Sequence, residues 1–250
     1  MPTPVNHLVM AQELIAAGDL TPHAHSLVTA HRGPFLLGHT APDVQTVSGQ
    51  TRGSTHFYEI PPRDDTPAPR AFLAAHPQLA RAAQLDPAHA AFLAGYLAHL
   101  QVDEAWWREV FAPLFGPAAG WGEWEERLFL HNVLRTHLDR ADQARLDRDI
   151  APTLAATEPA GWLPFVSDEA LRRWRDLLVE QLTPGQHVRT AEVFAERMRV
   201  PAEAVEEALR SPVQMERLFR HAPPQRLAAY RADALRRGAA LVNDYLGGRL

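Results

Sequence analysis

Two residues on one predicted helix have the types and the spacing to hold a divalent ion. His99 and Asp103 lie four residues apart in AGYLAHLQVDEAWW, which places both side chains on one helical face, one turn apart. A neutral imidazole and a carboxylate so placed can bind the same ion, and imidazole suits zinc, nickel, copper and iron. A solvent-exposed His–Asp pair is the alternative. Gly95, one turn before His99, leaves room for a ligand or another backbone to approach.

Three further potential ligands lie where their polarity is otherwise unexplained. His7 shares a predicted helix face with the apolar residues Met10 and Leu14, and its alternative role is that of a hydrogen-bonded core histidine. Asp43 follows a proline in GHTAPDVQTV, where a turn or a helix N-cap is the alternative. His56 lies in GSTHFYE, where a half-exposed loop residue is the alternative. The chain therefore offers three imidazoles and two carboxylates for one site.

The composition narrows the chemistry that this chain can perform. The 250 residues include no Cys, and all 25 basic residues are Arg. These two facts exclude disulfides, thiolate zinc sites, Cys nucleophiles and every mechanism that needs a lysine. The net charge of −5, with Arg and acidic residues interspersed, argues against a stable nucleic-acid partner. The start of the chain does not resemble a signal peptide and no run of 18 apolar residues occurs, so we expect no transmembrane segment and a cytoplasmic location.

Helix signals dominate the sequence, and we predict an all-α fold. A Ser, Thr or Asp cap followed by Pro marks helix starts at Thr3, Thr21, Asp86 and Ser211. No segment shows sustained period-two alternation, and residues 34–68 are expected to form a long loop. The expected helices cover residues 4–18, 22–32, 69–82, 86–115, 121–157, 168–182, 190–199, 201–210, 212–221 and 224–246.

The stretch PGQHVRT, residues 184–190, is the best candidate for a domain boundary. We predict a metal-binding helical body over 1–183 and a helical C-terminal extension over 184–250 packed on it, with one single domain as the alternative. The last helix carries an apolar stripe that is expected to face either the core or a second copy of the chain, which leaves a homo-oligomer open. The stripe consists of Leu227, Tyr230, Ala234, Leu241 and Tyr245.

Four motifs together resemble a known family, the zinc-dependent phospholipase C-like proteins, whose architecture is related to that of the P1-type nucleases. The motifs are MPTPVNHLVMA, FLLGHTAPD, GSTHF and FLAGYLAHLQVDEAWW, and the resemblance covers about residues 1–142. It implies a multi-helix bundle that hydrolyses a phosphodiester or phosphomonoester by means of a metal-bound hydroxide. The implied partner is a small-molecule or lipid phosphoester.

The resemblance also implies a set of ligands. His56, His99 and Asp103 match the ligands of one zinc ion, and His7 and Asp43 match those of a second, with Asp43 as a bridge to the first. Two such ions would lie roughly 3.5–4 Å apart, and other divalent metals are an alternative to zinc.

The chain departs from the family's pattern in two places. The secreted phospholipases complete their cluster with a processed amino-terminal Trp, whereas this chain begins Met1-Pro2. The family's remaining ion takes a His followed by His-x-x-x-Glu, but Arg135 and Ala141 stand four residues after the two candidate histidines here. A third metal site is therefore not expected in the family's form.

The segment LFLHNVLRTHLDRAD offers substitutes along one helical stripe. Arg135 could hold a substrate phosphate in a forked contact, and His131 or Asp142 could serve as an extra ligand or hold one in place. A salt-bridged exposed face is the alternative. The candidate catalytic residues are thus Asp43, His131 and Arg135, and the candidate metal ligands are His7, Asp43, His56, His99, Asp103 and Asp142.

The remaining histidines of the first half match no position in this site and are expected at the surface or in loops. They are His23, His25, His31, His39, His76 and His89. A protein that binds a metal for structure, or holds a partner, without catalysis is the alternative to a phosphoesterase.

Overall fold

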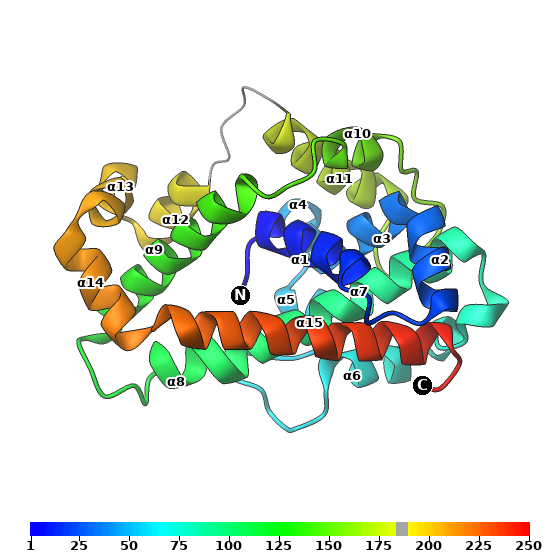
Figure 1. Ribbon diagram of the computed structural model, residues 1–250, viewed down its shortest axis with the longest axis horizontal. Coiled ribbons are helices and arrows are strands. Elements are labelled where there is room, and N and C mark those ends of the chain that lie inside the picture. Colours follow the sequence, from blue (N-terminus) through cyan, green and yellow to red (C-terminus); the bar gives the residue numbers. More distant parts are fainter. Residues whose placement is uncertain (184–189) are drawn as a thin grey trace.

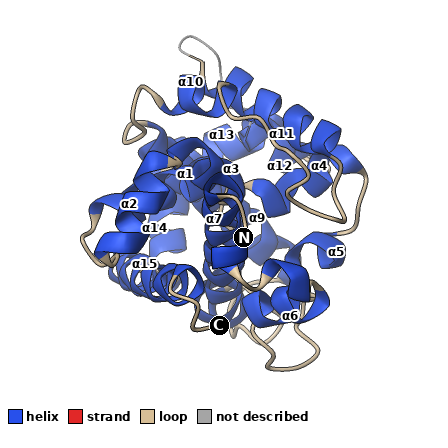
Figure 2. Ribbon diagram, turned by 90° about the vertical axis from the view of Figure 1, so that its right-hand side faces the viewer, coloured by secondary structure: helices blue, strands red, loops and turns tan. Residues whose placement is uncertain are grey.

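The computed structural model describes residues 1–183 and 190–250, and these residues form helices and loops without any β-strand (Figures 1 and 2). The predicted all-α class is confirmed for this part of the chain. The longer helices are α1 (Pro4–Ala16), α2 (Pro22–Ala30), α6 (Ala68–Ala75), α7 (Pro87–Trp106), α9 (Trp124–Gln143), α11 (Asp168–Leu182), α12 (Thr190–Met198), α13 (Ala202–Arg210), α14 (Pro212–His221) and α15 (Pro224–Leu246). The shorter ones are α3 (Arg32–Gly38), η1 (Ala41–Val44), α4 (Gln45–Ser48), α5 (Arg52–His56), η2 (Pro77–Leu79), η3 (Ala82–Gln84), η4 (Trp107–Phe111), α8 (Ala112–Leu114) and α10 (Ile150–Ala155).

All four predicted caps are present. The side chains of Thr3, Thr21, Asp86 and Ser211 each accept a hydrogen bond from a backbone N–H two or three residues further on, and a proline follows each cap. These bonds satisfy donors that have no partner inside the helix. The cap-and-proline signal therefore placed the starts of α1, α2, α7 and α14 correctly.

The prediction was wrong for the segment expected to be a loop. Residues 34–68 contain most of α3 together with η1, α4 and α5, which are too short to show a helical period in the sequence. The helix expected over 22–32 ends at Ala30, and Gly33, just beyond it, lies inside α3 and is buried against Thr157 and Thr153. The predicted helix over 121–157 is interrupted between α9 and α10, at residues 144–149.

Helix α7 lies at the centre of the fold, with α3 packed on one side and α15 running along another (Figure 1). Fifteen of its 20 residues are buried, so the helix has no broad solvent-exposed face. A helix buried on nearly all sides offers its polar residues no water. His99 and Asp103 must therefore find partners within the protein.

Helix α15 contributes to both apolar clusters of the core. Tyr245 belongs to the cluster around the first half of α7, and Tyr230 belongs to the one around Trp106. The predicted stripe of this helix is buried or half-buried within the chain, which agrees with the core alternative. The boundary proposed in PGQHVRT falls on residues 184–189, outside the described residues, so the division into body and extension stays a prediction.

Among the described residues, no helix combines the length and the apolar character needed to cross a bilayer.

Two glycines allow α3 and α7 to come into backbone contact. A Cβ atom added to Gly38 would lie 1.9 Å from the carbonyl oxygen of Phe92, and one added to Gly95 would lie 2.2 Å from that of Phe35. Of the two alternatives given for Gly95, the structure shows the close approach of another backbone. This contact places His39, at the end of α3, beside α7.

We predict that Gly95→Ala destabilises the protein, because neither backbone can yield without separating the two helices. Overpacking of this kind costs about 1–3 kcal/mol, measured as the free energy of unfolding in urea. Gly120→Ala is the matched control, since its Cβ would meet nothing within 4 Å. Equal stability of the two variants would contradict the role of Gly95.

Candidate metal centre

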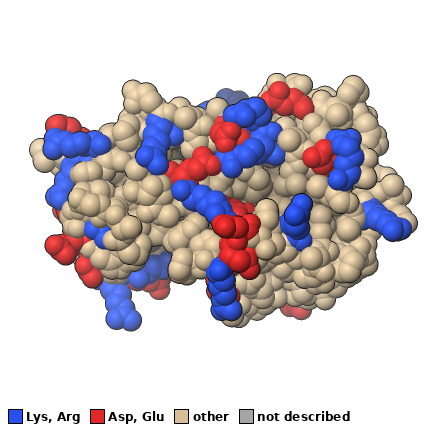
Figure 3. All heavy atoms as spheres, turned by 90° about the horizontal axis from the view of Figure 1, so that it is seen from below, with Lys and Arg blue, Asp and Glu red and all other residues tan. Residues whose placement is uncertain are grey.

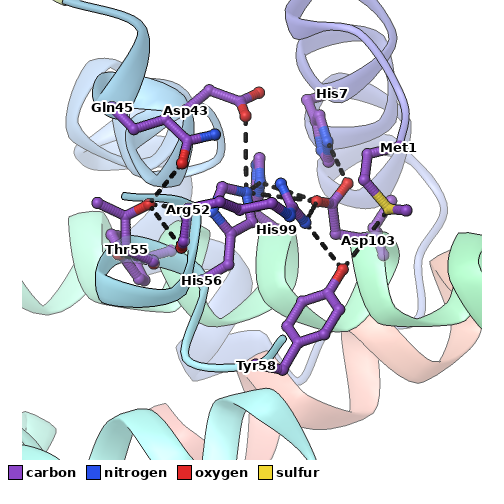
Figure 4. A network of polar contacts seen from close by, with 12 residues as sticks. Met1, His7, Asp43, Gln45, Arg52, Thr55, His56, Tyr58, His99 and Asp103 are labelled. Atoms are coloured by element: carbon purple, nitrogen blue, oxygen red, sulfur yellow. Dashed lines mark hydrogen bonds and ion pairs between the residues drawn. The ribbon is translucent and has the colours of Figure 1, made fainter. Parts of the chain in front are cut away.

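Five of the predicted ligands converge from four elements (Figure 4). α1 supplies His7, η1 supplies Asp43, α5 supplies His56, and α7 supplies both His99 and Asp103. The side chains of all but Asp43 are at most 1% exposed, and that of Asp43 is 18% exposed. The structure thus brings together residues that are up to 96 positions apart in the sequence.

Several donor atoms lie at separations close to those around a metal ion. His56 Nε2 lies 3.3 Å from His99 Nε2, 3.3 Å from Asp103 Oδ2 and 3.6 Å from Asp43 Oδ1. His99 Nε2 lies 3.9 Å from Asp103 Oδ2. Two zinc bonds of about 2.0–2.1 Å at the tetrahedral angle separate their ligand atoms by about 3.3–3.4 Å. Asp43, His56 and His99 could therefore hold one metal ion, and Asp103 lies beside the two imidazoles as a further carboxylate donor.

The two imidazoles are held with Nε2 toward this point. The ring Nδ1 of His99 lies 2.9 Å from the carbonyl oxygen of His39, to which it can donate when Nε2 is left as the ligand atom. The ring Nδ1 of His56 lies 3.0 Å from the hydroxyl of Thr55, the residue before it in α5. Such contacts fix the orientation of metal-ligating histidines.

His39 is part of the cluster, and the prediction of a surface or loop role for it was wrong. Its side chain is fully buried, and neither ring nitrogen has a hydrogen-bond partner in the structure. One ligand atom of His39 lies within 4.8 Å of ligand atoms of His7 and His99, which makes a second group that could hold an ion. The apolar run Phe35-Leu36-Leu37 just before it in the sequence was the available signal that this segment is buried.

The protonation states of Asp103, Asp43 and His99 are those that a metal requires. Burial alone would raise the pKa of Asp103, but the Arg52 guanidinium and hydrogen bonds with His56 and His7 hold it well below its usual value. The pKa of Asp43 is also low, because contacts with His56 and His99 outweigh its burial. Burial, reinforced by His7, lowers the pKa of His99 to about 3. Ionised carboxylates thus face a neutral imidazole at neutral pH.

Arg52 lies at the accessible side of the cluster, and the sequence analysis did not single it out. One of its terminal nitrogens donates to Asp103 Oδ2 at 2.5 Å and to the hydroxyl of Tyr58 at 2.8 Å (Figure 4). Its side chain is 24% exposed, compared with none for the histidines. Tyr58 is contacted in turn by the sulfur of Met1, 3.5 Å from its hydroxyl.

Arg135 faces the same carboxylates from α9 without touching them. Burial and the neighbouring charge of Arg197 lower its pKa to about 10, while the negative charges of Asp103 and Asp43 oppose this shift. Its guanidinium lies over the ring of Phe194, with the charged carbon 4.0 Å from the ring centre, and its Nε has no partner.

His131 and Asp142 lie outside the cluster. His131 Nε2 accepts a hydrogen bond from the indole of Trp106 at 3.0 Å, and its ring packs against Phe111 and Phe115. Asp142 accepts hydrogen bonds from three side chains: Asn6, Arg145 and Arg231. Its pairing with Arg145 matches the salt-bridged alternative, although Asp142 itself is buried. Neither residue is within contact of the five converging side chains.

A cavity of about 730 Å³ lies elsewhere, between α6, α7 and α15. None of the clustered residues lines it; its walls include Leu73, Leu241 and four arginines. The cavity therefore adds nothing to the candidate centre.

Arginine and acidic side chains are interspersed on the face seen in Figure 3, rather than forming an extended basic patch there.

Comparison with known proteins adds no relative. No family model, no curated protein and no solved structure matches the chain. The resemblance to the phospholipase C-like proteins thus rests on the four sequence motifs alone.

We predict that the purified protein retains at least one zinc ion per chain after zinc loading and desalting. His56→Ala and His99→Ala should each lose most of this metal, because each removes a donor that the remaining side chains cannot replace. Elemental analysis of the desalted variants checks the prediction.

Two further variants serve as controls for these losses. His25→Ala removes an exposed histidine and should retain its zinc. His131→Ala should retain zinc as well, but should lose about 2–5 kcal/mol of stability, as other large buried side chains do. Unchanged zinc in His99→Ala would contradict the assignment of the centre.

Proposed function

We propose that this protein is a zinc-dependent phosphoesterase on a phospholipase C-like scaffold. One observation carries the proposal: His56 Nε2 lies within 3.6 Å of a donor atom on each of Asp43, His99 and Asp103. The four motifs of the resemblance supply the reaction class, and the positive side chains near the site suit a phosphate group.

Zinc fits this set of donors better than the common alternatives. Two imidazole nitrogens with two carboxylate oxygens, at tetrahedral separations, are within the usual ligand range of zinc. Calcium and magnesium prefer shells of oxygen atoms, and copper(II) prefers tetragonal geometry. Other divalent ions that accept imidazole remain an alternative that elemental analysis decides.

The second ion of the proposal belongs on the His7 side, and Asp103 is the carboxylate placed to join the two. Its Oδ1 lies 3.3 Å from His7 Nε2, whereas its Oδ2 lies 3.3 Å from His56 Nε2. The sequence suggested Asp43 as the bridge, but Asp43 contacts only the His56 side in the structure. His39 supplies a further nitrogen for the second ion.

Bound zinc would acidify a water molecule and offset the charge that develops on the phosphoryl oxygens. The residues of the chain perform the other tasks. Asp43 is the ionised ligand with the most exposure, and its Oδ2 makes no protein hydrogen bond, so it can accept a proton from the attacking water. Arg135 is near enough to feel the charges of Asp43 and Asp103, its Nε has no partner, and in this proposal it binds the phosphate.

A metal site that serves structure alone is the second candidate, and one observation favours it. Four protein donors can fill a tetrahedral shell, and closed shells are typical of structural zinc. In that case a partner protein or stability, rather than hydrolysis, would be the purpose of the centre.

We predict hydrolysis of p-nitrophenyl phosphate or bis(p-nitrophenyl) phosphate by the zinc-loaded protein, with loss of activity on chelation and recovery on reloading. Asp43→Asn should lower kcat by about 10²–10⁴, because it removes the proton acceptor. Arg135→Gln should raise KM more than it lowers kcat. Steady-state kinetics of each variant checks these expectations.

Two exposed residues provide matched controls for the kinetic test. Asp64→Asn changes a fully exposed carboxylate, and Arg140→Gln changes an exposed arginine of the same helix as Arg135. Both should behave as the unchanged protein does. A fully zinc-loaded protein that hydrolyses neither ester would favour the structural candidate.

A further inference from the structure

Arg52 shares a carboxylate oxygen with the candidate metal centre. Asp103 Oδ2 lies 2.5 Å from an Arg52 nitrogen and 3.3 Å from His56 Nε2. The same oxygen therefore serves a fixed cation on one side and the metal position on the other. A metal ion in the centre would therefore compete with the Arg52 guanidinium for this oxygen.

The two carboxylates of the centre balance the first ion without Arg52, and the proposed second ion would add positive charge that they do not offset. The two carboxylates, Asp43 and Asp103, neutralise one divalent ion, and His99 is neutral. Arg52 is always charged, and its pKa is raised further by Asp103. A loaded centre therefore carries excess positive charge on the side where Arg52 and Asp43 are exposed, and this charge calls for an anion.

Arg52 also has N–H groups that are free to donate hydrogen bonds to a ligand. Its Nε is buried and has no partner in the structure, and only one of its terminal nitrogens is engaged. The face of Tyr58 supports the guanidinium, whose central carbon lies 5.2 Å from the ring centre. A planar fork held in this way suits a bidentate contact with a tetrahedral oxyanion.

We propose that Arg52 forms an oxyanion subsite beside the metal centre, which takes phosphate or the phosphoryl group of an ester. Metal binding draws Asp103 toward the ion and releases the Arg52 donors to the anion. Arg135 on α9 also lies within the electrostatic reach of Asp103 and Asp43 and adds a second positive charge near the centre. The inference rests on the proposed metal centre and names the side chain that selects an anionic substrate.

This arrangement predicts effects of opposite sign on the two ligands. Arg52→Gln removes a cation that repels the metal and competes for Asp103, so zinc should bind about tenfold tighter. The same change removes the charged fork, so inorganic phosphate should bind the zinc-loaded protein at least about tenfold more weakly. Isothermal titration calorimetry with zinc, and then with phosphate on desalted zinc-loaded protein, measures both constants.

Two variants sharpen the test. Arg52→Lys keeps the charge but loses the planar fork, so zinc affinity should stay near that of the unchanged protein while phosphate affinity falls. Arg63→Gln is the matched control, because Arg63 lies nearby in the sequence with its side chain 81% exposed, and it should change neither constant. Arg52→Lys also keeps the test available if Arg52→Gln does not fold.

Each other outcome overturns the inference in a recognisable way. Weaker binding of both zinc and phosphate in Arg52→Gln, with Arg52→Lys restoring both, would show that Arg52 merely supports the fold of the centre. Zinc binding without any phosphate binding in the unchanged protein would remove the subsite and leave the metal centre intact. Absence of zinc binding in the unchanged protein would remove the proposed function itself.

Discussion

The burial of one carboxylate in the central helix is the constraint on which the site depends. Asp103 is 1% exposed within α7, a helix surrounded by protein, and an ionised group in such a place must be paired. His7 from α1 and both Arg52 and His56 from α5 contact its two oxygens. A single negative charge therefore holds polar groups of two other helices against α7, and removing it would take one partner from each of them.

The close packing of α3 against α7 brings a further element to the site. Because Gly38 and Gly95 let the backbones of α3 and α7 touch, the end of α3 reaches the level of His99, where the carbonyl of His39 orients that ring. The side chain of His39 enters the cluster from the same turn. The absence of side chains at these two glycines thus allows His39 to give the centre a hydrogen bond and an imidazole. The residues around His99 in the sequence do not indicate either contribution.

The sequence predicted the features that neighbouring residues determine, such as helix starts. It did not predict the contacts between residues that are far apart in the chain. Caps and prolines gave the helix starts, an apolar helix face pointed to His7, and the four-residue spacing from His99 pointed to Asp103. His56 was assigned through the resemblance, and the structure brings these residues together. Helical spacing could not show that Trp106 takes up the ring nitrogen of His131, or that Arg231, 89 residues away, pairs with Asp142. Arg52 was missed for the same reason, since its partner lies 51 positions further on.

The distribution of exposure bears on the choice between a structural and a catalytic centre. A purely structural site gains from complete enclosure, since water competes for the ion and weakens the attraction between its ligands. Here the histidines and Asp103 are enclosed, while Asp43 and Arg52 are accessible and carry opposite charges. This arrangement suits hydrolysis of an anionic substrate. The accessible carboxylate of Asp43 can accept a proton, and the accessible Arg52 can bind the negative charge. In a structural site the positive charge of Arg52 would repel the ion and weaken its binding. The same charge is favourable when an anion binds at the centre.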